Sequence, residues 1–73
     1  MITITFTKTS MATGDVVKIK EFSTEKEGMS FFHEVADELN YHNMTEDVNS
    51  ARRLYEIGGL GYDYRIELEI ACV

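Results

Sequence analysis

Alternation of apolar and polar residues marks the first part of this chain as two strands. Residues 2–8 alternate isoleucine and phenylalanine with threonine, which is typical of a strand with one buried face. Residues 15–22 repeat the pattern, and it predicts that Val17 and Ile19 face the core while the lysines between them face water. A short loop of small and polar residues separates the two segments, so we expect a β-hairpin.

The end of the chain alternates in the same way over residues 62–72. This pattern predicts a strand that carries Cys72 on its apolar face, where a buried cysteine behaves as a small hydrophobic residue. The strand over residues 2–8 is expected at an open sheet edge, because little besides Lys8 would blunt it against pairing with another chain.

Residues 24–41 have helical signals at both ends. Ser23 or Thr24 is expected to cap the helix, and Thr24 and Glu27 have the spacing of a capping box, in which side chains satisfy free backbone N–H groups of the first turn. Asn40 or Asn43 is expected to end the helix in a left-handed conformation. A helix is therefore predicted between these signals.

The predicted helix has one apolar and one acidic face at 100° per residue. The residues expected to face the core are Met29, Phe32, Val35, Ala36 and Leu39. The residues expected on the opposite face are Glu27, Glu34 and Glu38, with Asp37 and Tyr41 beside them. Gly28 interrupts the first turns and lowers their stability by about 1 kcal/mol relative to alanine.

Residues 45–57 fit either a helix or a strand. As a helix, the segment would be capped by Thr45 and stopped by Gly58, with acids in its first turn and arginines toward its end. As a strand, residues 52–57 would pair through the glycine-rich turn onto residues 62–72. We favour the helix because both of its ends carry matching signals.

These elements predict one α+β domain over residues 1–73. The expected architecture is a two-layer sandwich, with a small antiparallel sheet and helices on one of its faces. The element order would be ββααβ, or ββαββ if residues 45–57 form a strand.

Length and composition exclude several classes of protein. At 73 residues with 44% apolar and 27% charged residues, the chain resembles a small globular domain with a thin core. The single cysteine cannot form an internal disulfide, which suits a reducing cytoplasm. Residues 1–8 alternate instead of running apolar, so no signal peptide is expected. No apolar stretch approaches the length of a membrane span, so none is expected either.

The charge of the chain is concentrated in residues 24–47. This window holds seven acids and one lysine, so its net charge of −6 equals that of the whole chain. An acidic protein of this kind is not expected to bind nucleic acid directly, which usually requires basic patches. It is compatible with binding to a basic surface of a protein or of a protein–nucleic acid complex.

The charge pattern therefore favours a small, non-enzymatic binding protein, of the type of phage inhibitors or nucleic-acid mimics. We expect Glu27, Glu34, Asp37 and Glu38 to steer a basic partner electrostatically. Tyr41 and Phe31 are the candidate aromatic anchors. The alternative function is a structural or oligomerising subunit, which would form a homodimer or larger homo-oligomer through a strand edge or a helix face.

Catalytic and metal chemistry find little support in the residue pattern. The acids and His42 at helical spacing form a straight row, whereas metal ligands must converge, usually from more than one element. No serine or cysteine is spaced from a general base in a way that would indicate nucleophilic catalysis. We therefore predict no cofactor, no metal site and no catalytic residues.

Overall fold

The computed structural model describes residues 1–72, which form five strands and one helix. Along the chain, these elements are β1 (Ile2–Ser10), β2 (Val16–Phe22), α1 (Glu25–Leu39), β3 (Thr45–Val48), β4 (Arg52–Gly58) and β5 (Tyr64–Cys72). Within this part of the chain, α1 is not both long and apolar enough to cross a membrane.

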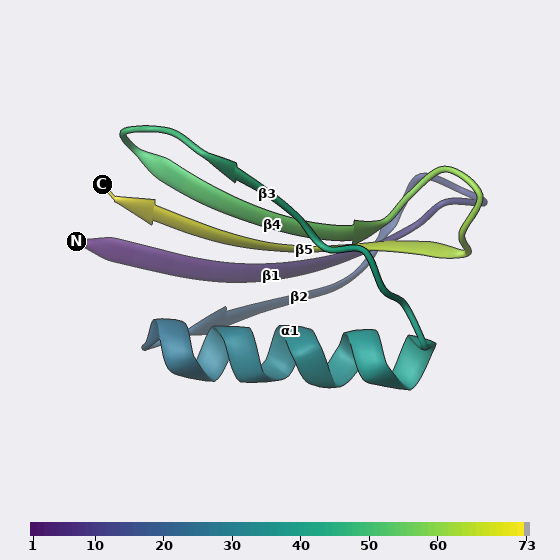
Figure 1. Ribbon diagram of the computed structural model, residues 1–73, viewed down its shortest axis with the longest axis horizontal. Helices are drawn as coiled ribbons and strands as arrows, with labels where there is room; N and C mark the ends of the chain where they lie inside the picture. Colours follow the sequence, from purple (N-terminus) through teal and green to yellow (C-terminus); the bar gives the residue numbers. More distant parts are fainter. Residues whose placement is uncertain (73) are drawn as a thin grey trace.

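The strands form one antiparallel sheet in the order β2-β1-β5-β4-β3, and α1 lies along one of its faces (Figure 1). The other face, called the open face below, carries no helix formed by the described residues. The predicted α+β class is confirmed. The predicted order ββααβ is wrong, because the described residues contain a single helix, and the alternative ββαββ omits one strand. The observed order is ββαβββ.

Residues 45–57, for which a helix was favoured, form β3 and β4 instead. The strand alternative is confirmed for β4, which pairs with β5 through the glycine-rich turn. In this register Tyr55 lies opposite Leu68 and Ile57 lies opposite Ile66. Pairing buries all four side chains, and this tertiary gain outweighs the capping signals, which only set a weak local preference.

The core lies between α1 and the sheet. Its buried members come from β1, α1, β4 and β5, and they are Ile4, Phe6, Phe32, Ala36, Tyr55, Ile57, Ile66, Leu68 and Ile70. The alternation predicted for β5 is confirmed from Ile66 to Ile70, where every second residue is buried. In β1 it holds for Ile4 and Phe6, but Ile2 is exposed, and Thr9 is buried after a register shift between Lys8 and Thr9.

Both predicted caps of α1 are present. The Thr24 hydroxyl accepts a hydrogen bond from the Glu27 backbone N–H at 3.2 Å and also donates to the Glu27 carboxylate. Asn40 ends the helix with φ 57° and ψ 40°, and its N–H returns to carbonyls of the last turn. The helix is therefore fixed at both ends by the residues that the sequence indicated.

Gly28 is the point of closest approach between α1 and the sheet. A Cβ atom at this position would lie 2.7 Å from Ile4 Cγ2 and 3.3 Å from Leu68 Cδ1. A contact of 2.7 Å is far inside the usual van der Waals separation of carbon atoms. The glycine that weakens the isolated helix thus allows the helix to pack on β1 and β5.

The side chains of β2 point in the directions opposite to those predicted. Val17 and Ile19 are 53% and 62% exposed, and Ile19 lies across from Thr7 on the open face. Lys20 lies across from Phe6 and is therefore on the helix side of the sheet. The prediction that Val17 and Ile19 face the core is wrong.

Lysine stems take the place of aliphatic side chains beneath the helix. The ammonium groups of Lys18 and Lys20 lie 5.2 and 4.8 Å from the centroid of the Phe31 ring. Long basic side chains can cover an aromatic surface while their charged ends stay in water. Because β2 is the outermost strand, its helix side remains wet enough for this arrangement.

Two further expectations about strand ends are wrong. β1 is an interior strand of the sheet, and the outer strands are β2 and β3. Cys72 is exposed, because it is the last residue of β5 and lies opposite Ile2 beyond the end of the core. Its thiol is free.

Candidate functional site: the acidic side of the helix

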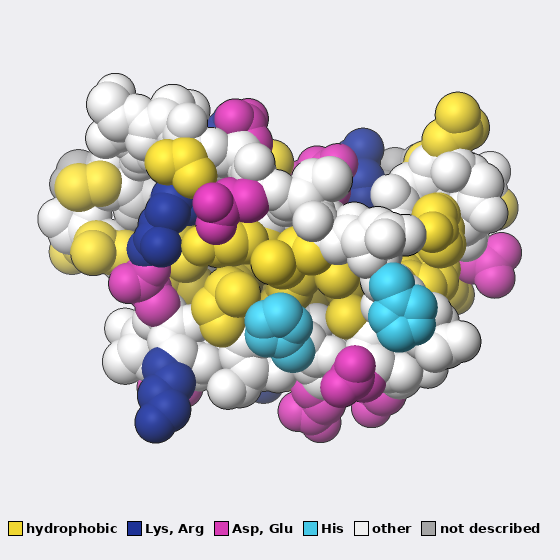
Figure 2. All heavy atoms as spheres, viewed as in Figure 1, with side chains coloured by type: hydrophobic (Ala, Val, Ile, Leu, Met, Phe, Trp, Pro, Cys, Tyr) yellow, Lys and Arg dark blue, Asp and Glu magenta, His cyan; other side chains and the backbone are white. Residues whose placement is uncertain are grey.

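The four predicted carboxylates gather on the side of α1 that faces away from the sheet. Glu27, Glu34, Asp37 and Glu38, called the acidic pole below, all lie within about 60° of the direction opposite Phe32 at 100° per residue. All four are exposed. Figure 2 shows acidic side chains together on the outer side of the helix, in its C-terminal half. The structure thus brings these four predicted residues together.

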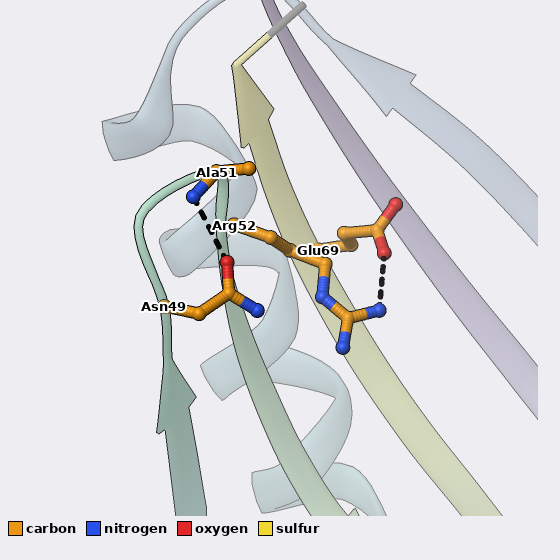
Figure 3. Close-up of polar contacts among 4 residues, drawn as sticks. All are labelled: Asn49, Ala51, Arg52 and Glu69. Atoms are coloured by element: carbon orange, nitrogen blue, oxygen red, sulfur yellow. Dashed lines mark hydrogen bonds and ion pairs between the residues drawn. The ribbon is translucent and has the colours of Figure 1, made fainter.

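The arginines of the chain are paired elsewhere. Arg52 pairs with Glu69 on the open face at 3.2 Å (Figure 3), and Arg65 pairs with Glu67 at 3.0 Å. Arg53 on β4 pairs with Glu25 at the start of α1. Within residues 1–72, no ion pair involves a carboxylate of the acidic pole. Its negative charge is therefore not cancelled by direct contact.

Three lysines form a row on the helix side of β1 and β2, next to the acidic pole. In this lysine row Lys8 lies opposite Lys18, and Lys20 follows two residues along β2. Lys18 and Lys20 cover the ring of Phe31, and Lys8 lies 4.2 Å from the centroid of the Tyr64 ring. Among the described residues, none of the three forms an ion pair.

The lysine row borders the acidic pole on one side only. Around the helix axis, Glu27 and Glu38 lie within about 40° of Phe31 at 100° per residue. The other side of the pole, around Asp37, turns away from β2. Lys18 and Lys20 on the β2 side therefore weaken the field near Glu27 and Glu38 more than near Glu34 and Asp37. Lys26, on the Asp37 side of the helix, is eight or more residues away from Glu34 and Asp37 along α1.

Phe31 is partly buried and packs inside the molecule. Its ring meets the Phe6 ring edge-on, with centroids 4.8 Å apart, and it lies 5.3 Å from the Phe22 ring. Together with the two lysines above it, Phe31 closes the side of the core near β2. A partner would reach only the part of the ring that remains exposed.

Tyr41 lies beyond the end of α1 and turns toward the sheet. Its hydroxyl accepts a hydrogen bond from the Tyr64 backbone N–H at 3.2 Å, and its ring centroid is 4.8 Å from that of Tyr62. The ring also packs against the core. Tyr41 therefore holds the turn before β5, and the structure does not bring it into the acidic pole.

Sequence reasoning missed a second group of acids on the open face. Glu56 on β4 lies directly opposite Glu67 on β5, and Asp47 on β3 lies on the same face, opposite Leu54. Like charges facing each other across strands lower the stability of a sheet. Interpreting residues 45–57 as a helix hid this group, because its members come from three strands and share a face only through the pairing of those strands.

An open hollow of about 250 Å³ lies at the end of the sheet that carries the β3–β4 turn. Its lining combines aliphatic side chains with Arg52, Arg53 and Cys72. In the turn, the Asn49 side-chain oxygen accepts a hydrogen bond from the Ala51 N–H at 2.9 Å (Figure 3). The arginines at the hollow are used in ion pairs, so its chemistry is mainly that of a shallow apolar surface.

The two histidines, His33 and His42, are exposed. Over residues 1–72, no three histidine, cysteine or acidic side chains are placed to hold a metal ion. Comparisons of the chain with protein-family models, with curated proteins and with solved structures find no match. The interpretation of the site therefore depends on its own geometry and charge.

Proposed function

We propose that this protein is a small, non-enzymatic binding module whose acidic pole docks onto a basic surface of a protein or protein–nucleic acid complex. The observation that carries the proposal is that the carboxylates of the acidic pole are exposed and form no ion pair within residues 1–72. Inhibitors and nucleic-acid mimics encoded by phages or mobile elements act in this physical way. A reducing, cytoplasmic setting suits the free thiol of Cys72.

The cost of assembling the acidic pole supports this proposal. Glu34 and Glu38 are four residues apart on the same helix, and like charges at this spacing destabilise a helix by about 0.2–0.5 kcal/mol. The arginines of the chain nevertheless form ion pairs with carboxylates outside the acidic pole. A surface that serves only solubility would mix both signs.

In the proposed mechanism, the carboxylates first attract the partner and then form charge-assisted contacts with its lysines and arginines. Electrostatic steering mainly raises the association rate and is weakened by salt. Glu34 and Asp37 contribute most, because the lysine row lies farther from them. Phe31 and Tyr41 would add apolar contact only through the exposed parts of their rings.

Affinity capture from the natural host tests this function. The wild-type chain and the variant Glu34→Lys/Asp37→Lys serve as baits, and Glu46→Lys/Asp47→Lys is the matched control. Both variants raise the net charge by the same amount, but the control changes exposed acids of β3. We expect a partner that is captured by the wild type and the control at low salt and lost with the pole variant. Equal capture by all three baits would contradict the proposal.

The second candidate function, an oligomerising subunit, is favoured by one observation. The outer strand β2 exposes Val16, Val17 and Ile19 beside an unpaired strand edge, and exposed strand edges promote association with further chains. If self-association is the function itself, the purified chain forms assemblies that persist on dilution. Sedimentation velocity over a range of concentrations distinguishes such assemblies from a monomer.

A further inference from the structure

The free edge of β2 carries both signs of charge on the helix side of the sheet. Lys18 and Lys20 lie on β2 itself, and Glu27 and Glu38 lie on the flank of α1 that faces this strand, next to Phe31. None of these four charged groups has an ion pair within residues 1–72. A row of bases thus runs beside a row of acids along one open edge.

An interface between two identical chains related by a two-fold axis must be self-complementary. If one residue of the first copy contacts another residue of the second copy, the same contact occurs again with the two copies exchanged. Adjacent rows of opposite charge satisfy this requirement. The other outer strand, β3, does not satisfy it, because it has four residues, Thr45–Val48, and its charged residues are both acids. The two edges of the sheet therefore differ in the partner they fit.

We propose that two copies of this chain pair through β2 in an antiparallel, two-fold arrangement that extends the sheet across both copies. The regular part of β2 begins after the bulge that shifts its register near Thr9. Pairing centred on Lys20 uses all of this regular part and places Lys18 against Phe22 of the partner subunit. It also covers part of Ile19, which is 62% exposed in the single chain.

The flanking helices offset the repulsion between the lysines that meet at the two-fold axis. The two copies of Lys20 face each other, but Glu27 and Glu38 of both helices line the same channel from its two sides. Four lysines are then enclosed by four carboxylates. Opposite charges in a partly desolvated channel interact more strongly than they do at an exposed surface.

The paired arrangement leaves the outermost part of each acidic pole free. The helix packs on β5, β1 and β2, so its axis lies roughly above β1. Three strand spacings separate β1 from its copy, which sets the helices about 14 Å apart. Glu34 and Asp37 point away from the sheet and stay exposed, so the dimer presents two acidic stripes to one partner. The pairing goes beyond the proposed docking function and holds if that function fails.

Sedimentation velocity of charge-exchanged variants tests the pairing. Wild type is expected to sediment at twice the mass of one chain at high concentration, with less dimer as salt is added. Two double variants are expected to be monomers: Lys18→Glu/Lys20→Glu and Glu27→Lys/Glu38→Lys. The first makes the β2 row and the α1 row both acidic, and the second makes both rows basic, so the two copies repel each other. An equimolar mixture of these two variants is expected to form a heterodimer, since opposite rows meet again.

Lys26→Glu is the matched control, because Lys26 is an exposed base on the other flank of α1, and it is expected to leave the dimer intact. Circular dichroism verifies that each variant is folded. Glu38→Lys alone replaces the double acid variant if loss of the Thr24–Glu27 contact unfolds the helix. A wild-type chain that remains monomeric at hundreds of micromolar, or a mixture that fails to associate, would overturn the pairing. Capture of a host partner by the acidic pole is a separate readout, so each proposal can fail alone.

Discussion

Replacing Gly28 with alanine is expected to have two opposing effects on the free energy of unfolding, a gain from helix propensity and a loss from packing. Alanine in place of glycine within a helix is favourable by about 1 kcal/mol, because the unfolded chain loses less freedom. In this protein the added Cβ would lie 2.7 Å from Ile4 Cγ2 and 3.3 Å from Leu68 Cδ1. The sign of the net effect therefore shows whether α1 packs on β1 as closely as the structure indicates.

The packing cost is expected to exceed the gain. Ile4 Cγ2 is attached directly to the Cβ of a residue in an interior strand, so it cannot move aside without distorting the side chain or the sheet. Inserting a methyl group into a tight core typically costs about 1–3 kcal/mol. We predict a net loss of about 1 kcal/mol, which lowers Tm by about 4–8 °C in a domain of this size.

Urea denaturation followed by circular dichroism measures this change in the free energy of unfolding. Ser30→Ala is the matched control, because Ser30 is on the exposed side of the same helix, and it should stabilise by a few tenths of a kcal/mol. In an Ile4→Leu background, which removes the γ2 branch, Gly28→Ala should become neutral or stabilising. An unfolding free energy that rises by about 1 kcal/mol in the wild-type background would show that α1 does not pack on β1 this closely.

Three further predictions concern individual side chains. Tyr41→Phe removes the acceptor for the Tyr64 N–H and should lower the free energy of unfolding by about 1 kcal/mol, whereas an unchanged stability would mean that the hydroxyl makes no structural bond. Asn40→Ala should destabilise by about 1 kcal/mol and Asn40→Gly should not, because only the alanine strains the left-handed cap; equal chemical denaturation midpoints would contradict this. The exposed Cys72 should react with a thiol reagent in the native state as fast as in urea, and protection in the native state would show that it is covered.

The helix could be predicted in detail because its signals are local. Thr24, Glu27 and Asn40 act on backbone groups within one turn of themselves, and the apolar positions recur at the helical period. The acidic pole follows from the same periodicity. Its members needed no contact from a distant part of the chain to be placed together.

The errors lie where distant contacts decide the structure. Residues 45–57 have helical end signals, but Tyr55 and Ile57 gain burial only by pairing with β5. The orientation of β2 depends on Phe31, which supplies an aromatic surface for the stems of Lys18 and Lys20. Neither partner lies next to the segment that it controls, so alternation alone could not assign these faces.

Tyr41 illustrates the limit for the candidate site. At the helical period it falls beside the acids, but Asn40 ends the helix with a positive φ and turns the chain toward the sheet. The helix ends two residues earlier than predicted, at Leu39, and this difference converts a predicted binding side chain into a core contact. A cap that reverses the chain direction therefore limits how far a helical pattern can be extended.

The acidic pole of α1 is the surface proposed to bind a basic partner. Titrating the labelled protein with a lysine- and arginine-rich peptide, while recording amide chemical shifts, locates the binding surface directly. We expect shifts around Glu34 and Asp37 that fade with added salt and with Glu34→Lys/Asp37→Lys. Shifts centred instead on Glu56 and Glu67 of the open face, and unchanged in that variant, would rule out the acidic pole as the binding surface.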